Sequence, residues 1–193
     1  MSIEITRRQV VERAMYGAGF ATIGSTTLIA ACSSQPSRSR AAQYTSFRPD
    51  DVAWLDEVAE TILPATETPG AKEAGVGGFI ALMVEDTYSP EKQQRFRAGM
   101  TELEAECRTE AGVGFMAAMP AQRLALLARL DREAFNQKGS EPHYFRMLKE
   151  LTTLGYFTSE IGYTQAMRYV ESPGRFDPCV EFTPGEKVWA RHA

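Results

Sequence analysis

The side chains that most often carry out chemistry are scarce in this chain and poorly placed for it. Only two of its 193 residues are histidines, His143 and His192, and neither has a Cys, an Asp or a second His at the spacing of a metal-binding motif. No serine lies in the strand-turn-helix setting of a nucleophile elbow, so nothing indicates a Ser-His-acid triad. His143 directly follows Pro142 at the start of an expected helix, where a surface position is the simpler interpretation. We therefore predict no catalytic, cofactor-binding or metal-binding residue in this chain.

Acidic side chains are more numerous, and we expect most of them on the solvated faces of helices: Asp86, Glu91, Glu102, Glu104, Glu106 and Glu110. Paired carboxylates meet in space and not in sequence, so a carboxylate-based hydrolase stays open as an alternative, although no aromatic sugar platforms stand beside these acids. The glycines of residues 75–78 fit neither nucleotide-binding fingerprint, and no strand is expected before them. Packing and helix capping explain them better.

The first 31 residues have the layout of a secretory signal. Arg7 and Arg8 form an adjacent basic pair, an uncharged stretch of weak hydrophobicity runs over residues 14–31, and small residues lead into Cys32. The arginine pair indicates twin-arginine export, and a membrane helix is the weaker interpretation because Gly and Thr interrupt a short stretch. We expect a cleaved signal over residues 1–31, lipidation at Cys32 and a periplasmic, membrane-anchored product. This route carries folded proteins, commonly with a cofactor already inserted, so the question becomes where the cofactor is held.

Two further cysteines, Cys107 and Cys179, would enter the oxidising compartment with the exported domain. Cys107 lies on the apolar stripe of an expected helix and is a candidate for a buried thiol. The two thiols could form a disulfide with each other, they could remain free, or one of them could bridge to another chain. All three alternatives stay open because the sequence does not give the distance between the thiols.

The remaining chain predicts a tether and one helical domain. Residues 32–47 are rich in Ser, Gln, Pro and Arg, which is typical of a flexible tether, and residues 48–193 are enough for a single domain with a real core. The net charge is −4 and the basic residues do not cluster, so the chain lacks the electrostatic footprint of a nucleic-acid-binding protein. Apolar residues recur at helical spacing, and no window alternates as an exposed-face strand would. These patterns predict an all-α fold.

Prolines, serines and glycines mark the ends of the expected helices. The first begins after Pro49 and stops at Pro64, and the next starts at Val76 after a left-handed Gly75. Others open at Ser89-Pro90, Pro120 and Pro142, and a last one is expected over residues 161–170. We expect the following residues to face inward: Val52, Leu55, Val58, Phe79, Ile80, Phe96, Leu103, Cys107, Leu124, Leu127, Leu130 and Leu148.

The C-terminal tail, residues 171–193, combines prolines and glycines with aromatic residues, so we expect it to be extended. Such a tail becomes ordered only if its rings are buried, either on its own domain or on a partner. Rigid aromatic side chains anchor interfaces, and for this end of the chain core and interface stay equal alternatives. The residues predicted to contact a partner are Tyr156, Phe157, Tyr163, Tyr169, Phe176, Phe182 and Trp189.

Two runs of the chain, residues 61–76 and 151–160, resemble the gluconate 2-dehydrogenase subunit 3 family. The first is TILPATETPGAKEAGV and the second is LTTLGYFTSE, followed by Arg168-Tyr169 and Pro173-Gly174. The similarity covers about residues 48–190. It implies a small subunit of a membrane-associated, FAD-dependent sugar dehydrogenase. The large subunit, of the glucose-methanol-choline oxidoreductase type, would hold the FAD and the active site, and a cytochrome c with haem c would accept the electrons.

The resemblance also implies an answer to the cofactor question. The small subunit would act as an export escort that carries the twin-arginine signal for a large subunit without one, and the FAD would be loaded in that partner. The resemblance supplies no catalytic residue. Our first hypothesis is therefore a non-catalytic escort subunit, and the alternative is a self-contained periplasmic hydrolase or a binding lipoprotein.

Overall fold

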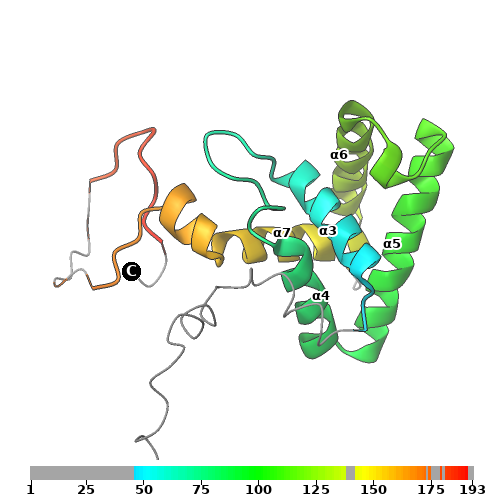
Figure 1. Cartoon of the computed structure of the whole chain (residues 1–193), viewed down its shortest axis with the longest axis horizontal. Coiled ribbons are helices and arrows are strands. Elements are labelled where there is room, and N and C mark those ends of the chain that lie inside the picture. The colour runs from blue at the N-terminus through cyan, green and yellow to red at the C-terminus, as the bar shows by residue number, and fades with distance from the viewer. Residues whose placement is uncertain (1–45, 138–141, 173, 175–178, 180, 191–193) are drawn as a thin grey trace, which may run out of the picture. The chain divides into compact units, whose positions relative to one another are not determined.

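A computed structural model of the chain describes residues 46–137, 142–172, 174, 179 and 181–190 (Figure 1). The predictions for the export signal at Arg7 and Arg8, for lipidation at Cys32 and for Phe176 fall outside these residues. The same holds for His192 and for all of the tether except its last two residues.

The described domain is helical, which confirms the predicted all-α class (Figure 1). No strand occurs within the described ranges, where a single isolated bridge joins Arg168 to Trp189. The elements in chain order are α3 (Pro49–Ile62), α4 (Val76–Thr87), α5 (Pro90–Ala111), the 3-10 turn η2 (Phe115–Ala117), α6 (Pro120–Asn136), α7 (Tyr144–Phe157) and the π-helical turn η3 (Gly162–Ala166).

The helix ends follow from local sequence. Proline occupies the first turn of α3, α5 and α6, where its missing N–H costs no hydrogen bond. The Ser89 hydroxyl caps α5 by accepting a hydrogen bond from the Lys92 amide at 3.5 Å. Gly112 ends the same helix in the left-handed region at φ 73°, as Gly75 does before α4 at φ 70°. The boundaries predicted at Pro64, Gly75 and Pro90 are confirmed.

Helix α7 lies among the other helices and packs against α3, α4, α5 and α6, while α3 and α4 pack closely on each other. The core is built from apolar side chains of all five helices and η2. Its largest fully buried members are Phe96, Phe115, Phe145, Leu55, Ile80, Leu103, Leu126, Leu130, Val58, Val76 and Val84. Burial of each such side chain contributes roughly 1.5–3 kcal/mol to stability. Because these buried side chains come from the five helices and η2, the helical domain has a core of its own.

Three predictions about this core are wrong. Leu124 is 59% exposed and Leu126 is buried in its place, because α6 turns the band of Leu126, Leu127 and Leu130 toward α3 and α7. Phe47, assigned to the tether, is buried, and the Arg97 guanidinium covers its ring at 4.0 Å. The folded domain therefore includes the last residues of the predicted tether.

The third error concerns the helix expected over residues 161–170. A helical turn starts there, but it ends after Ala166 as the π-helical turn η3, which is closed by a hydrogen bond from the Met167 amide to the Gly162 carbonyl at 3.0 Å. The backbone then becomes extended, because both polar groups of Arg168 bond to residues near the C-terminus rather than to the preceding turn.

Candidate interaction surface

The loop between α3 and α4 is held by one carboxylate of α3. Glu60 accepts hydrogen bonds from the amides of Ala65 and Lys72, both at 2.9 Å. Gly70 lies against the same carboxylate, and a Cβ at this position would come within 2.3 Å of its oxygens. The first of the two runs that resemble the family, residues 61–76, is therefore a loop folded around the end of α3.

Glu57 is committed to structural ion pairs. It pairs with Lys72 at 2.7 Å and also with Arg123 of α6. The hydrogen bond from Lys72 is the main reason that the pKa of Glu57 lies below its ordinary value, and Arg123 adds to the effect. The Arg123 guanidinium also lies 5.3 Å from the centre of the Phe115 ring. Through its two ion pairs, Glu57 connects α3 with the α3–α4 loop and with α6.

The second run, residues 151–160, lies against the first. The Tyr156 hydroxyl donates a hydrogen bond to the Pro69 carbonyl at 2.8 Å and lies 3.3 Å from the Thr68 hydroxyl. Next to it, Gly155 packs against Phe79 so closely that a Cβ would come within 2.6 Å of that ring. Two runs far apart in the sequence thus form one structural unit that fixes the α3–α4 loop to α7.

Tyr156 is consequently a correction to the predicted partner surface. Its side chain is 5% exposed and its hydroxyl is used internally, so it is a core residue. The sequence placed it in a cluster of aromatic residues but gave no sign of the distant loop that it contacts.

Two of the acids expected on solvated faces also have structural roles. Glu104 accepts hydrogen bonds from the Trp54 indole and the Phe115 amide, both at 3.1 Å. Glu106 pairs with Arg129 of α6, and this hydrogen bond is the main cause of the raised pKa of the guanidinium. In the part of the chain that the structure describes, no group of three or more His, Cys, Asp or Glu side chains could hold a metal ion.

His143 caps α7, which agrees with its predicted position at a helix start. Its ring nitrogen Nδ1 accepts a hydrogen bond from the Phe145 amide at 3.2 Å, and the ring stacks on Tyr144.

The two thiols of the described domain differ in their surroundings. Cys107 is 1% exposed, and burial raises its pKa, whereas Cys179 is exposed. Both thiols are free in this structure.

The remaining predicted partner residues are at least partly accessible, apart from Phe176, which lies outside the described residues. Phe182 is 60% exposed and Trp189 46%, and Phe157 and Tyr169 are also exposed. Tyr163 is half-buried and meets Tyr169 edge to face, with ring centres 5.6 Å apart. The exposed Val170 and Val188 belong to the same end of the chain, so apolar side chains gather there without a cover from the described domain.

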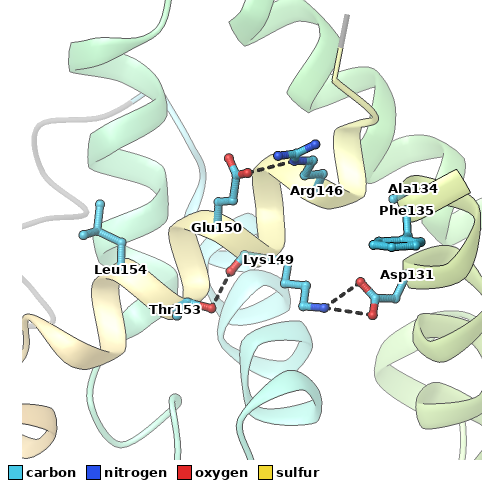
Figure 2. Close-up of a pocket in the computed structure, with 8 residues that line it drawn as sticks. All are labelled: Asp131, Ala134, Phe135, Arg146, Lys149, Glu150, Thr153 and Leu154. Atoms are coloured by element: carbon cyan, nitrogen blue, oxygen red, sulfur yellow. Dashed lines mark hydrogen bonds and ion pairs between the residues drawn. The ribbon is translucent and has the colours of Figure 1, made fainter. Parts of the chain in front are cut away.

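A groove of about 660 Å³ lies between α6 and α7 (Figure 2). Figure 2 shows the ion pair of Lys149 with Asp131, at 2.7 Å, joining the two helices, and Phe135 projecting beside it. The Phe135 side chain is 87% exposed, and Leu154 lines the groove farther along α7. Phe135 was not predicted as a surface residue, although its place directly after Ala134, off the inward stripe of α6, was a usable signal.

No helix within the described ranges is long and apolar enough to cross a membrane. Exposed apolar side chains of the described surface lie in the α6–α7 groove, at the aromatic C-terminal end and around η2, where Val113, Met116, Met119 and Leu124 are exposed.

Comparison with known proteins gives one match. The family model for gluconate 2-dehydrogenase subunit 3 matches residues 49–174, which include α3 to α7 and η3. No curated protein and no solved structure matches the chain. Because the family model covers most of the chain and all of its described helices, the chain belongs to the gluconate 2-dehydrogenase subunit 3 family.

Proposed function

We propose that this chain is the non-catalytic small subunit of an FAD-dependent sugar or sugar-acid dehydrogenase, and that it escorts the large subunit through twin-arginine export. The observation that carries the proposal is the family match over the whole helical domain, since the family is described as a subunit of a dehydrogenase. The partner is a large flavoprotein of the glucose-methanol-choline type that binds the FAD and the substrate. A cytochrome c subunit with haem c accepts the electrons.

The contacts of the domain support a binding role. Glu57, Glu104 and Glu106 are used to hold helices and loops together, while Phe182 and Trp189 are exposed at the C-terminal end. Aromatic side chains dominate the energetics of protein interfaces because they bury much apolar area with little loss of side-chain freedom. The C-terminal end is therefore the surface that contacts the large subunit.

The N-terminal residues supply export and anchoring in this proposal. Arg7 and Arg8 direct the folded complex to the twin-arginine route, and lipidation of Cys32 then holds it at the periplasmic face of the membrane. A lipid chain alone binds reversibly, so stable anchoring requires more than one acyl chain.

The test is to co-express the chain with its large subunit and to change both signal arginines to lysine, as Arg7→Lys with Arg8→Lys. Flavin absorbance and dehydrogenase activity should move from the periplasmic to the cytoplasmic fraction, because one signal serves both subunits. Arg38→Lys with Arg40→Lys is the matched control, since it makes the same change to an arginine pair in the tether. A large subunit that still reaches the periplasm when the signal arginines are changed would refute the escort role.

The alternative of a self-contained enzyme has its own readout. The purified chain should show neither flavin absorbance nor sugar oxidation, whereas the complex should show both. Substrate turnover by the isolated chain would replace the escort proposal with that alternative.

A further inference from the structure

Arg168 joins two segments of the chain that are twenty residues apart. Its amide donates a hydrogen bond to the Val188 carbonyl at 2.8 Å, and its own carbonyl accepts one from the Ala190 amide, also at 2.8 Å. These two bonds form the parallel bridge between Arg168 and Trp189. The backbone after η3 is therefore fixed by the returning C-terminal segment.

The Arg168 side chain strengthens the same junction. Its Nε donates to the Lys187 carbonyl at 2.9 Å, and its Nη2 pairs with Glu186 at 3.0 Å. The guanidinium lies over the Trp189 ring, 4.7 Å from its centre, in a cation–π contact. The turn that leads into this segment has Gly185 at φ 93°, which favours glycine. We call residues 168 and 186–190, with these contacts, the Arg168 clasp.

The clasp orients apolar side chains outward. Ala190 is buried at the junction, while its neighbour Trp189 is nearly half exposed and Val188 is exposed as well. Because the guanidinium covers one face of the indole, a partner can reach only the other face and the edge. Two exposed neighbours are charged, but both have partners within the chain: Glu186 pairs with Arg168, and Lys187 donates a hydrogen bond to the Gln165 carbonyl. The other exposed neighbours, Tyr169, Val170 and Val188, present apolar surface, so the geometry fits an apolar recess of a partner better than a charged one.

We infer that Arg168 is a positioning residue that holds Trp189 ready to dock into an apolar recess of the large flavoprotein subunit. This inference rests on the proposed function. A segment that is ordered before association loses less conformational freedom on binding, so preorganisation raises affinity. The family match ends at Gly174, so it includes Arg168 but not residues 186–190.

The experiment measures binding of the mature chain to its purified large subunit for the wild type, Arg168→Ala, Arg168→Lys and Trp189→Ala. Arg168→Ala should raise Kd about tenfold, and Arg168→Lys should restore part of the loss because Lys keeps the charge but not the planar fork. Arg48→Ala is the control, since Arg48 also forms an exposed ion pair with an acidic residue, Asp51, and does not line the α6–α7 groove.

A second readout separates positioning from a general structural role. Trp54 is buried, so acrylamide quenching of the native chain reports mainly on Trp189, with Trp189→Phe as the baseline. Arg168→Ala should make Trp189 more accessible to the quencher while the helical circular dichroism stays unchanged. The losses in affinity from Arg168→Ala and Trp189→Ala should be less than additive in the double variant, because one residue acts through the other.

The outcomes are distinct. An unchanged Kd for Arg168→Ala, in a complex that the wild type forms, overturns the positioning role and leaves the proposed function intact. A wild-type chain that does not bind the large subunit at all overturns the proposed function and this inference with it. Self-association of the wild type that Trp189→Ala abolishes, without binding to the large subunit, overturns the assignment of the partner.

Discussion

Replacing Glu104 with alanine should destabilise the domain far more than its place on a polar helix suggests. Its carboxylate accepts hydrogen bonds from the Trp54 indole of α3 and from the Phe115 amide of η2, both at 3.1 Å, and also pairs with Arg108 on its own helix. The rings of Trp54 and Phe115 lie 5.8 Å apart, so one carboxylate fixes both members of an aromatic pair.

The magnitude follows from the two donors that lose their acceptor. Leaving a buried donor unsatisfied costs about 1–3 kcal/mol, and partial access to water places each of these donors near the lower end. The exposed ion pair with Arg108 adds little. We expect a loss of about 2–3 kcal/mol in the free energy of unfolding, which lowers Tm by roughly 5–12 °C for a domain of this size.

The assay is urea unfolding of the mature domain at neutral pH, followed by circular dichroism and by tryptophan fluorescence. Glu102→Ala is the matched control, because this exposed glutamate lies two residues away on the same helix. It should change stability by less than about 0.5 kcal/mol. If Glu104→Ala and Glu102→Ala unfold at the same urea concentration, the structural role assigned to Glu104 is wrong.

Three further predictions concern charge, packing and thiols. The pKa of Glu57 is depressed in the folded state, so the stability that its carboxylate contributes is present above the ordinary pKa of 4.5. That contribution is lost as the pH falls through the lower folded pKa. Glu57→Gln should therefore lower Tm in thermal melts at pH 7 and have less effect at pH 3. Gly77→Ala would place a Cβ 2.6 Å from main-chain atoms of α3 and should cost about 1–3 kcal/mol in urea unfolding, whereas a neutral result would mean that α3 and α4 separate easily. Cys179 should react with a thiol reagent in the native chain, and Cys107 should react only in denaturant. If Cys179 instead forms a disulfide with the large subunit, non-reducing electrophoresis of the complex will give a band at the summed mass.

The helix ends were predictable because they depend on local chemistry. In α5, for example, Ser89 and Pro90 mark the start and the left-handed Gly112 marks the end, and neither boundary depends on contacts with distant residues. The inward stripes were predictable only approximately, since periodicity gives a face but not the direction from which neighbouring helices approach it. Leu124 is the clearest case, because its spacing fits the stripe and its exposure is decided by the packing of α6 on α3 and α7.

Long-range contacts explain the other differences. Tyr156 is buried because its hydroxyl reaches Pro69 in a loop 87 residues earlier. The helix expected over residues 161–170 stops early because Arg168 takes its backbone partners from Val188 and Ala190. No local pattern contains these partners, and the same limit hid the role of Glu104, whose carboxylate resembles any other on a polar helix face.

The two tryptophans separate the stability of this domain from its capacity to bind. Trp54 is buried, bonded through its indole to Glu104 and packed on Phe115, so it belongs to the closed helical core. Trp189 is nearly half exposed, and its ring is held by Arg168 outside the helices that make up that core. Because the core closes without the aromatic C-terminal end, substitutions at Arg168 and Trp189 should change affinity while leaving the unfolding transition in place. Substitutions around Trp54 should shift the unfolding transition instead. A loss of binding can therefore be assigned to the C-terminal surface only when the unfolding transition of the variant is unchanged.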